Sequence, residues 1–201
     1  MRVFQAKSLL ALAAALMLAC VLPMNGPAQA APAVAAPAHD PVKIAVAVQI
    51  LDNLQTLPIA IQASRHSLLS DPTVTAMSPA DQVLLGQLLS DELTKRHDEM
   101  MTGLAADNVD RFSLDQLNNI LIFSRIKYVQ QLARAAADSS LPTPDPTTMS
   151  EQEWKDFNTI GNADYTADFL NNFNFAAESH VVGEAVTAAV LRLATIRSGK
   201  P

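Results

Sequence analysis

Apolar residues recur at every third or fourth position from Ile44 onward, and this spacing is the period of an amphipathic helix. One stripe runs from Ile44 to Leu57, and another follows Ser78, where Pro79 occupies a favoured first helical position. The strict apolar–polar alternation of a half-buried strand is not found along the chain. The sequence therefore predicts an all-α fold, a compact bundle of about five to six helices whose short connections favour antiparallel packing.

Proline and glycine mark where these helices are expected to end. Pro58 is expected to kink or end the first helix, and Gly103 to end the one that carries Val83, Leu84, Leu88, Met100 and Met101. A further helix is expected over 113–137, followed by a stiff proline-rich loop at 141–146. The last two helical regions start at Ser150, with an interruption near Gly161, and over 181–196.

The N-terminal thirty residues have the three parts of a secretory signal peptide. Arg2 and Lys7 precede an uncharged apolar run over 8–22, and Ala28-Gln29-Ala30 supplies small residues at a cleavage site. We expect cleavage before Ala31, which places the mature chain in the periplasm or outside the cell. The competing interpretation is a lipoprotein, with Cys20 lipidated within Met17-Leu18-Ala19-Cys20.

The chain beyond the signal is acidic and lacks cysteine. The whole sequence has 14 Lys and Arg against 20 Asp and Glu, and the signal takes Arg2 and Lys7, so the remainder carries a net charge of −8. This charge argues against nucleic acids and anionic membranes as partners, and no transmembrane segment is expected in the mature chain. Without cysteine beyond Cys20, disulfides are excluded there, and stability depends on one hydrophobic core.

Residues 31–41 contain three prolines among small residues and are predicted to form a flexible linker, with His39 as a solvated tail residue. A single helical domain over 42–198 follows. Within it, two segments, 112–138 and 149–175, align without a gap at an offset of 37 residues. Ser113 and Ser150 are expected to cap the two helices, and Gln116 and Glu153, three residues on, complete capping boxes.

The same alignment predicts which side chains of the two copies face inward. The expected buried stripes are Leu117, Ile120 and Phe123 in one copy and Trp154, Phe157 and Ile160 in the other. Residues 77–81 resemble a third, weaker start. An internal duplication explains these matches, and the alternative is the general likeness of amphipathic helices.

One helix start resembles a known family. Phe112, Ser113, Gln116, Leu117, Ile120 and Phe123 are similar to the pattern of the periplasmic domain-of-unknown-function 2059 family over about 30 residues. That family continues with Tyr and then Ser-Pro-x-Gly, whereas this chain has Ser124 and then Ile-Lys-Tyr-Val at 126–129. The resemblance implies an exported helical protein of unknown activity and carries over no catalytic residue.

Histidines and acids show no recognisable catalytic or metal-binding spacing. His39, His66, His97 and His180 lack the i,i+4 partner typical of zinc ligands on a helix, so we predict no metal and no cofactor. The acidic stretch from Glu92 to Glu99, including His97 and Asp98, is interpreted as a solvated helix face.

Aromatic residues gather near the end of the chain and form the most distinctive feature. The candidate binding residues are Trp154, Phe157, Tyr165, Phe169 and Phe173. Packing in the core is the default interpretation, and an apolar groove for a ligand or a partner helix is the alternative.

These observations favour a non-enzymatic binding protein, with a protein partner preferred to a small ligand. The alternative is an envelope hydrolase, which would require His97 or His180 to contact both a serine and a carboxylate.

Overall fold

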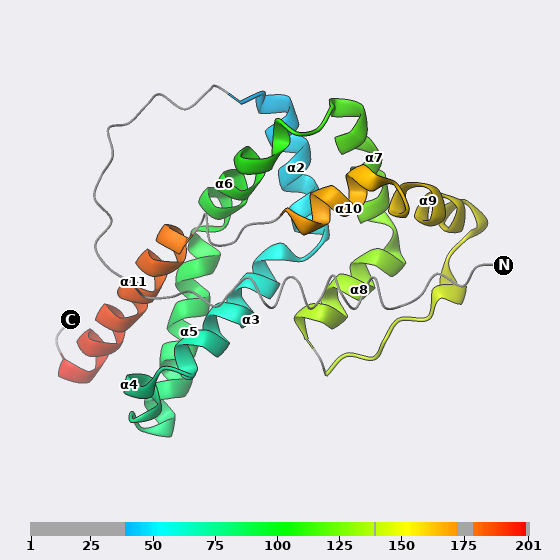
Figure 1. The fold of residues 1–201 in the computed structure, drawn as a ribbon. Helices are drawn as coiled ribbons and strands as arrows, with labels where there is room; N and C mark the ends of the chain where they lie inside the picture. The colour runs from blue at the N-terminus through cyan, green and yellow to red at the C-terminus, as the bar shows by residue number, and fades with distance from the viewer. Residues whose placement is uncertain (1–38, 139, 173–178, 200–201) are drawn as a thin grey trace.

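The computed structural model describes residues 39–138, 140–172 and 179–199, which form an all-α structure (Figure 1). Within these ranges there are ten α-helices and no strand, so the predicted class is confirmed and the helix count exceeds the predicted five to six. The elements are α2 (Pro41–Asn53), α3 (Thr56–Leu69), α4 (Pro72–Thr75), α5 (Pro79–Lys95), α6 (His97–Val109), α7 (Leu114–Arg125), α8 (Lys127–Ala137), the 3-10 helix η1 (Pro146–Thr148), α9 (Glu151–Gly161), α10 (Asp164–Asn171) and α11 (Ser179–Ser198).

Side-chain caps mark the starts of five of the ten described α-helices. The hydroxyl groups of Ser113 and Ser150 each accept a hydrogen bond from the backbone N–H three residues on. In turn, the side chains of Gln116 and Glu153 accept a hydrogen bond from the backbone N–H of the capping serine. Both predicted capping boxes are therefore confirmed. Simpler caps start three other helices, each with a proline in the first turn: Asp40 for α2, Asp71 for α4 and Ser78 for α5.

Three helical stretches are broken at a residue that is neither proline nor glycine, and the second and third of these breaks divide segments that the sequence predicted as single helices. The first stretch ends at α2 and resumes at α3, 63° away, after Gln55 adopts a left-handed φ of 58°. Pro58, expected at this break, instead lies in the first turn of α3, where a missing N–H costs little. The second stretch breaks at Arg96, so Gly103 lies inside α6 and ends no helix. The third breaks at Ile126, whose extended backbone keeps its side chain in the core.

The buried side chains form two clusters. The first joins α2, α6 and α7 with residues from α8, α9 and α10, and it includes Leu51, Leu104 and Leu117. The second joins α4, α5 and α11, and Leu89 is at its centre, fully buried. Figure 1 shows this division, with α11 alongside α5 at one end and α9 beside α7 at the other. Leu57 of α3 packs against both clusters.

The end of the predicted linker is part of the folded structure. Residues 31–38 lie outside the described ranges, but Asp40 caps α2 and Pro41 is its first residue. His39 Nδ1 is 2.9 Å from Asp110 Oδ2. His39 is thus paired with the end of α6, whereas the sequence predicted a solvated tail residue.

Candidate functional site

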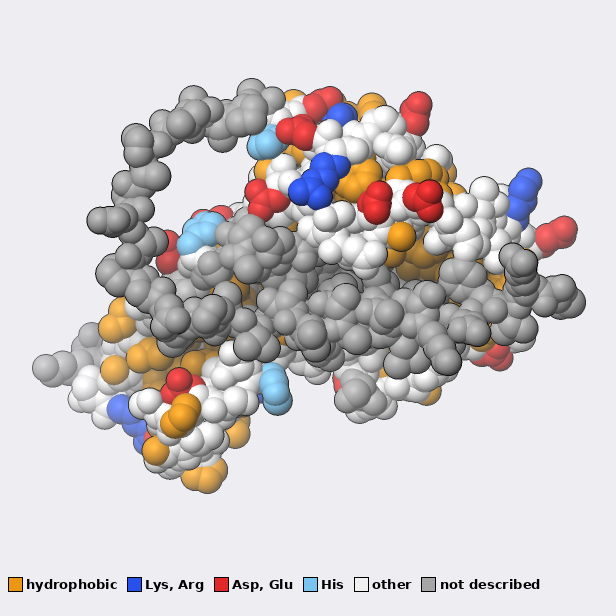
Figure 2. Space-filling view, in the orientation of Figure 1, with side chains coloured by type: hydrophobic (Ala, Val, Ile, Leu, Met, Phe, Trp, Pro, Cys, Tyr) orange, Lys and Arg blue, Asp and Glu red, His pale blue; other side chains and the backbone are white. Residues whose placement is uncertain are grey.

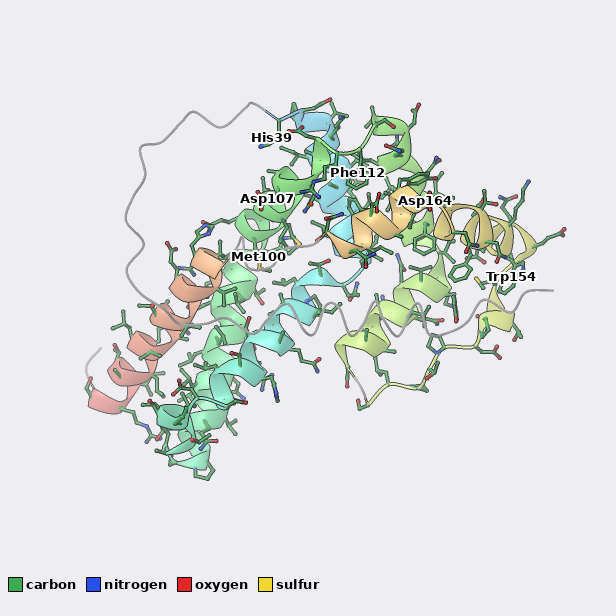
Figure 3. All side chains as sticks on the ribbon, viewed as in Figure 1. His39, Met100, Asp107, Phe112, Trp154 and Asp164 are labelled. Carbon is green, nitrogen blue, oxygen red and sulfur yellow. The ribbon has the colours of Figure 1, made fainter. Side chains whose placement is uncertain are left out.

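A shallow groove lies where η1 leads into α9. Its volume is about 380 Å³, and it is lined by Pro146, Thr147, Met149, Ser150, Glu151 and Trp154. Trp154 is the largest of these side chains and is 49% exposed, an unusual exposure for the only tryptophan of the chain. Figure 3 shows it at the α9 end of the molecule, far from His39 and Met100.

Aromatic stacking holds the indole in place. Phe123 of α7 stacks on Phe157 of α9 with ring centroids 5.7 Å apart, and Phe157 stacks in turn on Trp154 at 6.1 Å and 19°. Tyr128 meets Phe157 edge-on at 5.6 Å. A continuous series of rings therefore runs from the core to the groove, and it presents Trp154 as a supported aromatic surface.

The sequence prediction that Trp154 faces the core is wrong, whereas the other five stripe residues are buried as predicted. Leu117 and Ile120 are fully buried, and Phe123, Phe157 and Ile160 are 4%, 7% and 7% exposed. The difference lies in the neighbours: α7 is covered by both α2 and α9, whereas α9 packs on α7 and, more lightly, on α10. Within the described residues, the first turn of α9 therefore has less cover than α7, and Trp154 remains half exposed.

The aromatic residues proposed as one binding surface are divided by the fold. Phe157 and Phe169 are buried, and Phe169 meets Phe112 edge-on at 5.5 Å, so both belong to the core. Tyr165 is half-buried, and its hydroxyl accepts a hydrogen bond from Asn119 Nδ2 at 3.3 Å. Phe173 lies outside the described residues. Among the four described members of this set, Trp154 alone lines the groove.

The charged groups around the groove are mainly carboxylates. Glu151 is exposed on the groove wall and has no hydrogen bond or ion pair within the described structure. Hydrogen bonds from Thr147 lower the pKa of Asp145, and those from Ser150 lower the pKa of Glu153. Lys127 also acts on Glu153. The first turn of α9 carries two acids, Glu151 and Glu153. Their combined negative charge is larger than the partial positive charge of the helix N-terminus.

A second polar cluster surrounds Glu92, which the sequence placed on a solvated face. The residue is only 6% exposed, so this interpretation is wrong for Glu92. Its carboxylate accepts hydrogen bonds from Lys95 Nζ at 2.9 Å, Arg96 Nη1 at 3.2 Å and Arg192 Nη1 at 2.7 Å. The bond from Lys95 and, after it, those from Arg192 and Arg96 lower the pKa of Glu92 to about 2 against the opposing effect of burial. All three cations are committed to this contact, which ties α11 to α5.

His97 bridges two helices. Its Nε2 lies 2.8 Å from Asp52 of α2 and its Nδ1 lies 2.8 Å from Asp98, so both ring nitrogens face carboxylates. The bond to Asp98 and the bond and charge of Asp52 raise the pKa of His97, and partial burial opposes them. Neither ring nitrogen bonds a serine, and His180 is exposed at the start of α11. The described residues thus do not form the serine–histidine–acid contact that would favour a hydrolase.

Within the described ranges, no group of three His, Cys, Asp or Glu residues is placed to hold a metal ion.

Among the same residues no single helix has the length and apolar character of a membrane span. The bent pair α2 and α3, with a 63° angle between them, has this length and composition when the two helices are taken together.

Comparison of the chain with protein-family models, with curated proteins and with solved structures found no match. The resemblance to the 2059 family therefore stays a prediction.

Proposed function

We propose that this chain is an exported, non-enzymatic protein of the cell envelope that acts by binding a protein partner at the groove around Trp154. The single observation that carries the proposal is the half-exposed, stacked Trp154 on the wall of an open groove. Exposed tryptophans supported by packed neighbours are typical anchors of protein interfaces, because they bury a large area on binding and lose little side-chain entropy.

Export is part of the proposal and rests on the N-terminal sequence alone. The uncharged apolar run over 8–22 and the small residues Ala28 and Ala30 support it. A protein partner is favoured over a small ligand because the groove is shallow and wide open, whereas small-molecule sites enclose most of their ligand.

Site-specific photocross-linking in intact cells tests the binding site. A photoreactive phenylalanine analogue is placed at Thr147, on the groove wall, and separately at Thr159, which is exposed on α9 outside the groove. We expect a discrete adduct from position 147 that disappears when Trp154→Ala is added, and no such adduct from position 159. Equal adducts from both positions, or an adduct that survives Trp154→Ala, would contradict the proposal.

A further inference from the structure

We infer that the groove binds an arginine side chain carried on an otherwise apolar peptide segment of the partner. This inference rests on the proposed function and names the chemistry of its ligand. Two groups of the groove determine it: the exposed surface of Trp154 and the carboxylate of Glu151.

The indole is available to a cation. Phe157 supports Trp154 by stacking at 19°, and 49% of the tryptophan remains exposed. No described Lys or Arg side chain lies over this ring. A planar guanidinium stacks well on an indole, which is the strongest π partner among the aromatic side chains.

Glu151 supplies the matching charge. It lies three residues before Trp154, so both side chains project from one side of the first turn of α9 and both line the groove. Its carboxylate has no partner within the described structure, unlike Glu153, which caps the helix through Ser150. A cation resting on Trp154 can therefore also pair with Glu151.

The other charged groups near the groove also favour a positively charged ligand. Asp145 and Glu153 flank the groove as ionised carboxylates, whereas Lys127 is the only basic group that acts on either of them in the described structure. The whole chain carries a net charge of −6, which attracts a basic partner. The remaining wall, formed by Pro146 and Met149, is apolar and suits the aliphatic residues beside the arginine.

The single tryptophan makes this inference directly measurable. Because Trp154 is the only tryptophan of the chain, its fluorescence reports occupancy of the groove without labels. We would titrate the purified full-length protein with acetyl-Gly-Leu-Arg-Leu-Gly-amide and with the same peptide carrying citrulline, which has the shape of arginine but no charge.

We expect the arginine peptide to bind about three- to tenfold more tightly than the citrulline peptide, the factor expected from one cation–π contact and one exposed ion pair. In Glu151→Gln this preference should fall about two- to threefold, because the ion pair is lost and only the cation–π contact with Trp154 still distinguishes the two peptides. Asp156→Asn is the matched control, because it removes the same charge from α9 at a half-buried site that bonds Gln152 and does not line the groove. The control should keep the parental preference.

Equal affinity of the parent for both peptides would overturn the inference. So would a preference that Glu151→Gln leaves undiminished, a preference that Asp156→Asn lowers equally, or the absence of any fluorescence change with either peptide. The proposed function is judged separately by the cross-link from position 147. A Trp154-dependent adduct together with equal peptide affinities would leave the binding function standing and reject arginine as its ligand.

Discussion

Phe123 of α7 and Phe157 of α9 stack with their planes 25° apart, and this contact joins the two copies of the predicted repeat. The two residues are not equivalent: Phe123 is eleven residues from the start of its copy at Phe112, and Phe157 is eight residues from Met149. The copies thus meet through the same face of the helix but at different heights. The offset leaves the first turn of α9, with Trp154, beyond the end of the contact.

Truncation of the buried ring of Phe157 and of the exposed ring of Trp154 should cost different amounts of stability. Phe157→Ala should lower the free energy of unfolding by about 3–5 kcal/mol, because Phe157 is 7% exposed and contacts three aromatic rings. Trp154→Ala should cost less than about 1.5 kcal/mol, since half of its surface is already in water and mainly one stacking contact is lost. Urea denaturation followed by circular dichroism measures both. Equal costs would show that Trp154 is a core residue in solution.

Replacement of two helical glycines by alanine should change the stability of the protein in opposite directions. At Gly161 a Cβ would lie 2.9 Å from Phe123 Cε2, so Gly161→Ala should destabilise the protein by about 1–3 kcal/mol through overpacking. At Gly183 a Cβ would meet nothing within 4 Å, so Gly183→Ala should stabilise α11 by up to about 1 kcal/mol. Thermal unfolding of the two variants beside the parent checks the pair. A stabilising Gly161→Ala would mean that α9 stands further from α7 than the structure places it.

Glu92 should make the protein sensitive to acid. Its folded pKa of about 2 is below the ordinary value of 4.5, so its contribution is fully present above pH 4.5 and is lost as the pH falls towards 2. Glu92→Gln should lower the free energy of unfolding at pH 7 by about 1–3 kcal/mol, the usual cost of losing hydrogen bonds to a charged group. Denaturation at pH 7 and pH 3 measures this difference, which should shrink at the lower pH.

The control for Glu92 is its neighbour Asp91, which is exposed and lies 3.8 Å from Arg192. Asp91→Asn should change the stability by less than about 0.5 kcal/mol, as exposed ion pairs usually do. If Asp91→Asn costs as much as Glu92→Gln, the effect belongs to the overall charge of α5 and not to the buried carboxylate.

His97 should have the opposite pH dependence to Glu92 and should contribute most stability at low pH. Its pKa is raised above 6.5, so the stability that its bonds to Asp52 and Asp98 provide is fully present below pH 6.5 and is lost as the pH rises through the folded pKa. The difference in unfolding free energy between the parent and His97→Gln should therefore be larger at pH 6 than at pH 8.5. A proton NMR titration of the His97 ring gives the pKa itself, and an unshifted value would contradict the bridge between α2 and α6.

Processing of the N-terminus can be read from the mass of the exported protein. We expect the mature chain to begin at Ala31, because Ala28 and Ala30 follow the uncharged run at the spacing that signal peptidase recognises. Mass spectrometry of protein recovered from the envelope fraction checks this. A diacylated N-terminal Cys20 would establish the lipoprotein alternative instead.

Local chemistry explains which parts of the fold were predictable. The starts of α5, α7 and α9 follow from Ser78, Ser113 and Ser150, because each cap bonds only within its own helix. Pro58 indicated the first break only approximately, because the chain turns at Gln55, and no proline or glycine indicates the break at Ile126, whose side chain is buried in the core. Residue periodicity gives the face that a side chain occupies but not where the neighbouring helix ends. For that reason it identified Phe157 as buried and misplaced Trp154.

Long-range contacts explain what was missed around Glu92. The spacing to Arg96 is visible in the sequence and fits a solvated helix face equally well. The long-range partner, Arg192, is 100 residues away and reaches Glu92 because α11 packs along α5. A pattern within one helix cannot reveal such a pair. The aromatic-rich segment indicated the region of the groove, but of its described candidate residues only Trp154 lines it.

The placement of α11 has a consequence for the cooperativity of the whole chain. Val181, near its start, is buried in the first cluster, and Ala185, Ala189 and Leu193 are buried in the second. One rigid helix therefore belongs to both cores, and Leu57 of α3 makes the same connection from the other side. Loosening of either core would remove part of the cover of the other, and we therefore expect the two clusters to unfold in a single transition. Protonation of Glu92 should then also destabilise the helices that support the groove.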